Sequence, residues 1–197
     1  TLWGYDKSIQ PYAYDPAKAK ELLREAGYDD NLSFELMTYS DSRPYNPIGG
    51  DNLAAAIQGY LKEVGITVNI TSEPWQEYKQ DLRDEKGEAY LYGWTGDNGD
   101  PDNFLYVLLH SSQISGLNYS QYKNPQYDEL LEKAQQSSNI EERIRDYSAA
   151  QQILVKDAPW LFIGSSMYIA AANKKISSFT IHPTGIYVLK AVAKTAK

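Results

Sequence analysis

The stretch DNLAAAIQGYLKEVGITVNI, residues 51–70, sets a helix directly against a strand and decides the fold class. Its apolar side chains recur at helical spacing from Leu53 to Val64, which predicts an amphipathic helix. Gly65 is expected to end this helix, because glycine readily adopts the left-handed conformation found at helix C-termini. Residues 66–70 then follow as a strand. A helix that leads straight into a strand is typical of α/β folds.

The same alternation extends along the chain in both directions. Upstream, Asp15 and Pro16 predict the start of a helix that Gly27 ends, and residues 32–39 read as a strand. Further helices are predicted over residues 75–83, 104–109, 125–136 and 140–156. Further strands are predicted over residues 89–94, 160–171, 179–181 and 187–189. We therefore expect an α/β fold, with a mixed sheet and flanking helices.

Length and charge exclude several kinds of protein. The chain has 197 residues, 42% of them hydrophobic, so residues 1–197 can share one core as a single domain. Its formal net charge of −7 disfavours binding to nucleic acid or to an anionic membrane surface. No apolar run approaches the roughly 18 residues that cross a bilayer. No secretion signal begins at Thr1, so we expect any such signal to lie outside these residues.

An acidic loop follows the predicted strand 89–94. Counted from Asp97 as an EF-hand, its sixth position is Asp102 and its twelfth is Leu108, where glycine and glutamate are required. That calcium motif is excluded, although a looser calcium site stays open. We expect Asp102 and Asn103 to cap the next helix. Asp97 comes directly after the strand, and ligands of open α/β sheets bind at the carboxyl ends of strands.

A second candidate lies in the loop DSRPYNP, residues 41–47. Pro44 and Pro47 stiffen this loop, which also follows a predicted strand. A guanidinium held there suits forked recognition of a carboxylate, and Arg43 is the candidate. The alternative is an arginine that is simply solvated.

Catalytic and metal motifs are absent from the sequence. No Ser nucleophile motif accompanies His110 or His182, which we expect to be surface or capping residues. No phosphate loop, dinucleotide fingerprint or zinc motif occurs. Asp97 and Asp100 could in principle form the carboxylate pair of a hydrolase. We expect no cofactor and no enzymatic activity.

Three segments carry a family resemblance: YDPAKAKELLREAG at residues 14–27, SRPYNP at 42–47 and GWTGDNGDPDNF at 93–104. Together they resemble the dipeptide-binding members of the peptide, oligopeptide and nickel solute-binding family. Segments at 118–120, 122–131 and 158–160 extend the resemblance over nearly the whole chain. Members have two lobes of the class II periplasmic-binding-protein type, and this sequence resembles the smaller lobe. The resemblance implies that about residues 176–197 return toward a missing lobe.

The resemblance also implies a function and a set of ligand-binding residues. The protein would capture short peptides, in particular dipeptides, for an ABC importer at the extracellular face of the membrane or in the periplasm. Its partners would be the peptide, the missing N-terminal lobe and the permease, with membrane contact only through the permease or a lipid anchor. The implied ligand-binding residues are Arg43, Tyr45, Trp75, Gly93, Trp94, Thr95 and Asp97.

Each of these residues has an implied role. Arg43 pairs with the ligand carboxylate, Tyr45 assists it, and Asp97 pairs with the α-amino group. Backbone groups of Gly93 and Thr95 pair with the extended peptide as an added strand. The two tryptophans border side-chain pockets. The alternatives are an oligosaccharide or another small solute stacked on these tryptophans, and, more remotely, a carboxylate-dependent hydrolase.

Overall fold

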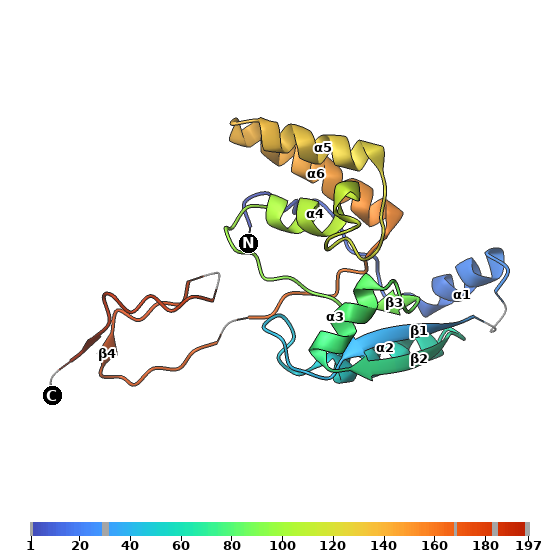
Figure 1. Ribbon diagram of the computed structural model, residues 1–197, viewed down its shortest axis with the longest axis horizontal. Coiled ribbons are helices and arrows are strands. Elements are labelled where there is room, and N and C mark those ends of the chain that lie inside the picture. The colour runs from blue at the N-terminus through green and yellow to red at the C-terminus, as the bar shows by residue number, and fades with distance from the viewer. Residues whose placement is uncertain (1, 29–31, 168, 183–184, 196–197) are drawn as a thin grey trace.

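The chain forms a sheet half, a helical half and an extended C-terminal arm (Figure 1). The computed structural model describes residues 2–28, 32–167, 169–182 and 185–195. The sheet half contains α1 (Pro16–Glu25), β1 (Ser33–Tyr39), α2 (Gly50–Lys62), β2 (Thr67–Glu73), α3 (Trp75–Arg83) and β3 (Ala89–Tyr90). The helical half contains α4 (Asp102–Leu109), the 3₁₀ helix η1 (Ser111–Gln113), α5 (Pro125–Gln136) and α6 (Ile140–Asp157). The arm contains β4 (Ile176–Ser177) and β5 (Ala193–Lys194).

The main sheet is parallel and has the strand order β2-β1-β3. The antiparallel pair β4-β5 forms a separate small sheet in the arm, so the two strand directions do not mix within one sheet. The expected α/β class with helices flanking a sheet is confirmed. In a parallel sheet the carboxyl ends of the strands meet at one edge. The loops after β1 and β3 therefore leave the sheet side by side.

Two hydrophobic cores stabilise the two halves. The core of the sheet half consists of Leu36, Met37, Tyr39, Ala54, Val68, Tyr78, Leu82 and Leu91. The core of the helical half consists of Leu108, Leu109, Tyr127, Leu131, Ala134, Tyr147, Ala150 and Leu154. Tyr92, which follows β3, packs against both cores. The segment after β3 therefore contacts both halves of the molecule as it runs away from the sheet.

The N-terminal strap, residues 2–14, ties the two halves together. Asp6 accepts a hydrogen bond from the Ser148 hydroxyl on α6 at 2.7 Å, and the Gln151 side-chain amide donates to the Gly4 carbonyl at 2.8 Å. Hydrogen bonds from Ser8 and Ser148 hold the pKa of Asp6 well below its usual value. At the other end of the strap, the Tyr14 hydroxyl donates to Glu63 beside α2 at 2.5 Å. The strap therefore spans from the helical half to the sheet half.

The sequence-based expectation for the start of α4 is wrong. The N-cap is Pro101, and neither Asp102 nor Asn103 caps the helix. Instead, Asp100 accepts a hydrogen bond from the backbone N–H of Asp102 at 3.0 Å. The Asn103 side chain turns back toward the preceding loop, where its oxygen accepts a hydrogen bond from the Trp94 indole N–H. A local pattern cannot distinguish such a return from a cap, because both use a short polar side chain near a helix start.

Several predicted strands are shorter than expected or unpaired. The ladder of β3 ends at Tyr90 although a strand was expected to residue 94. No strand forms among the described residues of 160–171, and Tyr168 lies outside them. The predicted strands 179–181 and 187–189 reduce to one isolated bridge, Ile181 to Tyr187. Apolar residues such as Leu161, 80% exposed, pair with no strand among the described residues.

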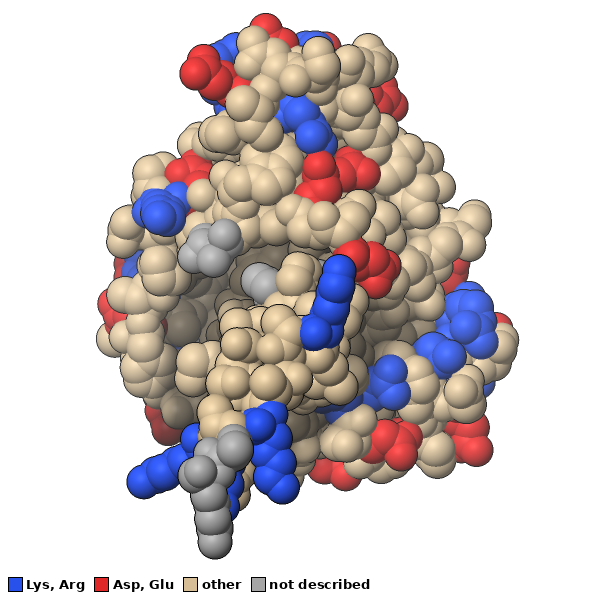
Figure 2. Space-filling view, turned by 90° about the vertical axis from the view of Figure 1, so that its left-hand side faces the viewer, with Lys and Arg blue, Asp and Glu red and all other residues tan. Residues whose placement is uncertain are grey.

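The arm also differs from the rest of the chain in charge. From residue 158 onward the sequence contains five lysines and no acidic residue, so the net charge of −7 divides into +5 here and −12 before it. Figure 2, in which the arm points at the viewer, shows basic side chains gathered around its end. Among the residues that the structure describes, no helix has the length and apolar character needed to cross a membrane.

Candidate functional site

The Arg43 loop, residues 40–49, is a closed turn at the carboxyl end of β1. Arg43 and Asn46 exchange backbone hydrogen bonds of 3.0 and 2.9 Å. The side-chain amide of Asn46, which is 8% exposed, donates to the Tyr39 hydroxyl at 3.1 Å and to the Gly49 carbonyl at 2.9 Å. The loop is therefore fixed from inside, and Arg43 projects from a rigid backbone.

Aromatic rings surround the Arg43 side chain. Its guanidinium carbon lies 3.9 Å from the centre of the Trp75 ring. The ring of Tyr39 meets Trp75 edge-on at 5.5 Å, and Tyr92 lies nearly parallel to Trp75 at 6.2 Å. Trp75 itself begins α3, and its backbone N–H donates to the Asp41 carboxylate at 2.8 Å. The guanidinium is thus held against an uncharged surface.

Two buried donor groups in this loop interact with each other but have no partner at normal hydrogen-bond geometry. Among the described residues, neither Nε of Arg43 nor the Tyr45 hydroxyl forms a hydrogen bond of normal geometry. Burial and neighbouring Tyr39 raise the pKa of Tyr45 to about 12, although adjacent Arg43 offsets part of the rise. The Tyr45 hydroxyl therefore stays protonated at neutral pH and can donate. Buried donors without partners are costly and rare, so this pair suits a ligand that brings an acceptor such as a carboxylate.

The Asp97 loop, residues 92–100, begins as a segment without regular secondary structure. The sheet hydrogen bonds end with that from Leu91 N–H to the Met37 carbonyl, at 3.0 Å. Within the described part of the chain, no backbone group from Gly93 to Gly96 makes a hydrogen bond. Backbone groups without hydrogen bonds, next to the end of a strand, can pair with an added peptide strand.

Gly93 lies where the two loops touch. A Cβ at this position would lie 2.4 Å from Cδ2 of Tyr45, so only glycine lets the tyrosine ring pack against the backbone there. The contact joins the Tyr45 ring to the Asp97 loop. The loops after β1 and β3 thus form one continuous site.

Asn103 closes the far end of the Asp97 loop. Its side-chain oxygen accepts from the Trp94 indole N–H at 2.9 Å and from the Asp97 backbone N–H at 3.1 Å. The Asp97 side chain is exposed, and no residue described in the structure forms a hydrogen bond or ion pair with its carboxylate. Its charge is therefore available to a ligand cation.

Asp100 has a structural role that argues against a hydrolase. Its carboxylate forms an ion pair with Arg143 on α6 at 2.9 Å and caps the backbone of Asp102. It is thus engaged by the protein and unavailable as half of a catalytic pair with Asp97.

His110 was expected to be a surface or capping residue. It is a cap but does not lie at the surface: it is 4% exposed, and as N-cap of η1 its ring accepts a hydrogen bond from the Ser112 N–H.

The sequence-predicted residues are only partly brought together. Arg43, Tyr45, Trp75 and Gly93 form one contact group. Trp94 instead packs against the core of the helical half, and the exposed Asp97 lies further along the same loop, after Thr95. Sequence reasoning missed the residues that hold the loops, namely Tyr39, Asp41, Asn46, Tyr92 and Asn103. The position of Asn46 between two loop prolines is the one local signal that could have identified it.

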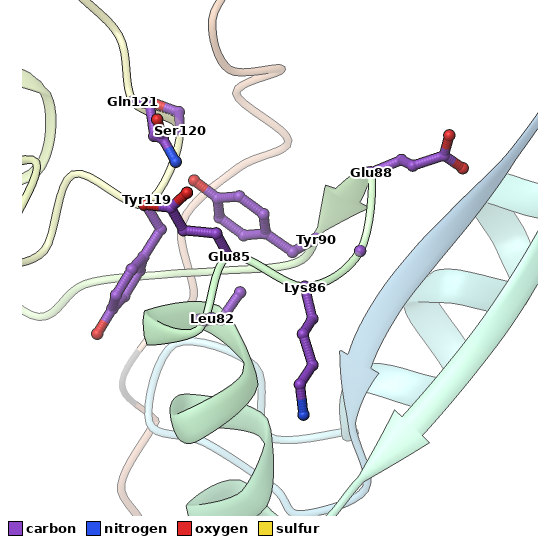
Figure 3. Close-up of a pocket in the computed structure, with 9 residues that line it drawn as sticks. Leu82, Glu85, Lys86, Glu88, Tyr90, Tyr119, Ser120 and Gln121 are labelled. Atoms are coloured by element: carbon purple, nitrogen blue, oxygen red, sulfur yellow. The ribbon is translucent and has the colours of Figure 1, made fainter.

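A small cavity lies at the opposite edge of the sheet (Figure 3). The cavity measures about 210 Å³ and lies between the turn Glu85–Glu88, which precedes β3, and the loop Tyr119–Gln121 of the helical half. It is smaller than most ligand pockets, which hold about 300 Å³ or more. Its place at the amino end of β3 separates it from the Arg43 and Asp97 loops.

The described residues contain no cluster of three His, Asp or Glu side chains suited to a metal ion.

Comparison with known families agrees with this architecture. Residues 1–116, more than half of the chain, match the family described as "Bacterial extracellular solute-binding proteins, family 5 Middle". The chain therefore belongs to this family of bacterial extracellular solute-binding proteins. It is a family of binding proteins rather than of enzymes.

The curated relatives include peptide-binding and heme-binding proteins. The chain is 35% identical to the dipeptide-binding protein of Escherichia coli over 94% of its own length and 35% of the relative. It is 36% identical to heme-binding protein A of Haemophilus influenzae, over 94% of the chain and 34% of the relative. The chain thus spans about a third of the length of these relatives.

Solved structures show the same fold. HbpA2 from Haemophilus parasuis matches with a TM-score of 0.91 and 30% identity, over 98% of this chain and 38% of that one. A dipeptide-binding protein from a Pseudoalteromonas species, in complex with Met-Leu, matches with a TM-score of 0.83 and 31% identity. That match covers 99% of this chain and 38% of the other.

Proposed function

We propose that the chain is one lobe of a two-lobed solute-binding protein that captures short peptides, above all dipeptides, for an ABC importer. The observation that carries the proposal is the pair of buried donors at Arg43 and Tyr45, which form no hydrogen bond of normal geometry, beside a backbone segment without hydrogen bonds. Membership of the solute-binding family and the dipeptide-binding relatives support the same ligand class.

The proposed binding mode uses both ends of a zwitterionic peptide. Arg43 and Tyr45 bind the carboxylate, and the exposed carboxylate of Asp97 binds the α-amino group. Backbone groups of Gly93 and Thr95 pair with the peptide, which recognises any sequence. The fixed distance between the charges of Arg43 and Asp97 then selects the length of the peptide. Trp75 and Trp94 border the space for ligand side chains.

The rest of the protein completes the site. We propose that residues 1–197 form the smaller lobe and that about residues 176–197 return toward the N-terminal lobe, outside this chain. The exposed apolar residues of the arm support such a covering partner. The whole protein acts in the periplasm or at the extracellular face of the membrane, which it contacts through the permease or a lipid anchor.

Calorimetry on the full-length protein tests this proposal. A dipeptide should bind, whereas its C-terminal amide and its N-acetylated form should each bind about 30-fold or more weakly, because each leaves a buried or enclosed charge unpaired. Arg43→Ala should remove the discrimination against the amide. Equal affinity for all three ligands, or preferential binding of a disaccharide, would overturn the proposal.

Heme is the competing ligand class, since one of the similar proteins is named heme-binding protein A. Heme propionates could also pair with Arg43, so sensitivity to Arg43→Ala does not separate the two ligands. Asp97 separates them, because heme has no amino group for it to bind. Loss of binding in Asp97→Asn supports a peptide, and heme binding that survives Asp97→Asn contradicts it.

The isolated lobe provides a further test. Closure of two lobes excludes water and supplies contacts from both sides, and one lobe offers only half of them. We expect the chain alone to bind dipeptides far more weakly than the full-length protein. Micromolar affinity of the isolated chain would contradict the two-lobed mode.

A further inference from the structure

We infer that Trp75 is a positioning residue that sets the plane of the Arg43 guanidinium for a ligand carboxylate. Asp41, which lies in the Arg43 loop, holds Trp75 in place. The inference rests on the proposed function and adds the means by which carboxylate recognition is achieved. It assigns to Trp75 a role distinct from that of bordering a side-chain pocket.

The stacking geometry supports this role. The guanidinium carbon of Arg43 lies 3.9 Å from the centre of the indole, well within the distance at which a cation is attracted to a ring face. A second cation, the Lys79 ammonium, lies farther away, at 5.7 Å. Arg43 is therefore the principal cation on this ring.

Stacking leaves the binding edge of the guanidinium free. All N–H bonds of a guanidinium lie in its plane, and carboxylates bind in that plane as a fork. A ring that contacts the flat face does not compete for these donors. The Nε donor of Arg43 is one of them; it is buried and forms no hydrogen bond of normal geometry with the described residues.

An uncharged partner also preserves the charge for the ligand. In the described structure Arg43 forms no ion pair, although Asp41 lies only two positions away. The carboxylate of Asp41 is engaged instead by the Trp75 backbone N–H at 2.8 Å. A carboxylate on Arg43 would satisfy the cation within the protein and compete with the ligand.

Trp75 is itself held on several sides. Asp41 fixes its backbone, Tyr39 meets its ring edge-on at 5.5 Å, and Tyr92 lies parallel at 6.2 Å with an interplanar angle of 16°. Tyr39 also accepts a hydrogen bond from Asn46, which closes the Arg43 loop. Loop and ring are therefore positioned by one another, so the guanidinium has a fixed platform.

The test is the ratio of dissociation constants for a dipeptide amide and the free dipeptide, measured in the full-length protein. Trp75→Leu should lower this ratio about tenfold, because the guanidinium loses its orientation. Trp75→Phe, which keeps a ring face, should retain most of the ratio. Lys79→Ala, which removes the other cation from the same ring, is the matched control and should leave the ratio unchanged.

A second measurement follows Arg43 directly by NMR in this chain. The side-chain protons of Arg43 should be shifted upfield by the indole in the wild type and in Lys79→Ala, and should lose the shift in Trp75→Leu. Absence of the shift in the wild type would overturn the inference without any ligand. The same spectra report whether Trp75→Leu is folded.

The outcomes separate this inference from the proposed function. If the wild type does not distinguish amide from free dipeptide, the proposed function fails, and the NMR measurement alone decides the stacking. If the wild type distinguishes them and folded Trp75→Leu keeps the same ratio, the inference is wrong. Should Trp75→Leu fail to fold, Asp41→Ala replaces it: a lowered ratio supports the inference, and an unchanged ratio overturns it.

Discussion

The Arg43 loop and the Asp97 loop leave neighbouring parallel strands, yet they are fixed in different ways. Each is closed by one asparagine, Asn46 or Asn103. Asn46 is buried, and aromatic rings hold the side chain of Arg43, whereas Asn103 fixes the backbone and the Asp97 carboxylate stays exposed. A long cationic side chain needs a surface to restrict its rotamers, while a short carboxylate is placed by its backbone alone.

Replacement of Asn46, which closes the Arg43 loop, should cause the largest loss of stability. Asn46→Ala leaves the Tyr39 hydroxyl and the Gly49 carbonyl without their donor in buried surroundings, so we expect a loss of about 3 kcal/mol in the free energy of unfolding. Chemical denaturation measures it. Asn52→Ala is the control, since Asn52 makes one exposed bond to the Ile48 carbonyl. Similar losses in both variants would show that the Arg43 loop is not fixed from inside.

A methyl group at Gly93 should disturb both loops at once. Gly93→Ala puts a carbon 2.4 Å from the Tyr45 ring, so ring or backbone must shift, at a cost of about 2 kcal/mol. The unfolding midpoint in denaturant reports the cost. Gly59→Ala is the control, because a Cβ at Gly59 meets no atom within 4 Å. Full stability of Gly93→Ala would contradict direct contact between the loops.

Loss of Asn103 should affect the Asp97 loop alone. Asn103→Ala removes the acceptor for the Trp94 indole and the Asp97 N–H, and we expect a loss of about 1 kcal/mol. Asn103→Asp retains an acceptor oxygen and should lose less. Backbone NMR shifts should change around Asp97 and remain unchanged around Arg43. Changes of equal size in both loops would contradict their independent closure.

The ion pair between Asp100 and Arg143 anchors the Asp97 loop to α6 more weakly. A double-mutant cycle should give a coupling of about 0.5 to 1 kcal/mol, since the pair is partly buried and doubly hydrogen-bonded. The exposed pair Glu129–Lys133 on α5 provides the comparison and should give less. A larger value for the exposed pair would refute the anchoring role.

The last prediction concerns Tyr45, whose contribution to the free energy of unfolding changes only at alkaline pH. The pKa of Tyr45 in the folded protein, about 12, lies above the ordinary value of 10.0, so its burial stabilises the fold below pH 10. That contribution is lost as pH rises from about 10 through 12. A tyrosinate absorbance titration of Tyr45→Phe should lack one group in this range. If the missing group titrates near pH 10, Tyr45 is not buried in the Arg43 loop.

Helices were the easiest part of the fold to predict from the sequence. The expected ranges 75–83 and 125–136 coincide with α3 and α5, and Asp15 caps α1 through the Lys18 N–H as expected. Caps and spacing are local properties, so they can be read locally. The strand expected over residues 160–171 does not form among those of its residues that the structure describes, because a strand requires a partner and no described strand pairs with them.

The charged residues of the candidate site could be proposed from the sequence, but the residues that support them could not. Arg43 and Asp97 were selected because charged residues in loops after strands are conspicuous, and their ligand-binding roles stay predictions. Asn46 and Asn103 were missed, because the value of a buried amide depends on which distant groups it reaches. Trp75 was expected at a ligand pocket, and its contact with Arg43 arises only when α3 and the loop after β1 meet.

The N-terminal strap has a consequence for how the lobe is made. Asp6 and Ser148 are 142 positions apart, so the strap cannot reach its final contacts until α6 has been synthesised. At ordinary rates of translation this delay is about ten seconds or more. The strap precedes α6 in the chain yet must wait for it, and slow closure of this long loop is the step where we expect chaperones to act.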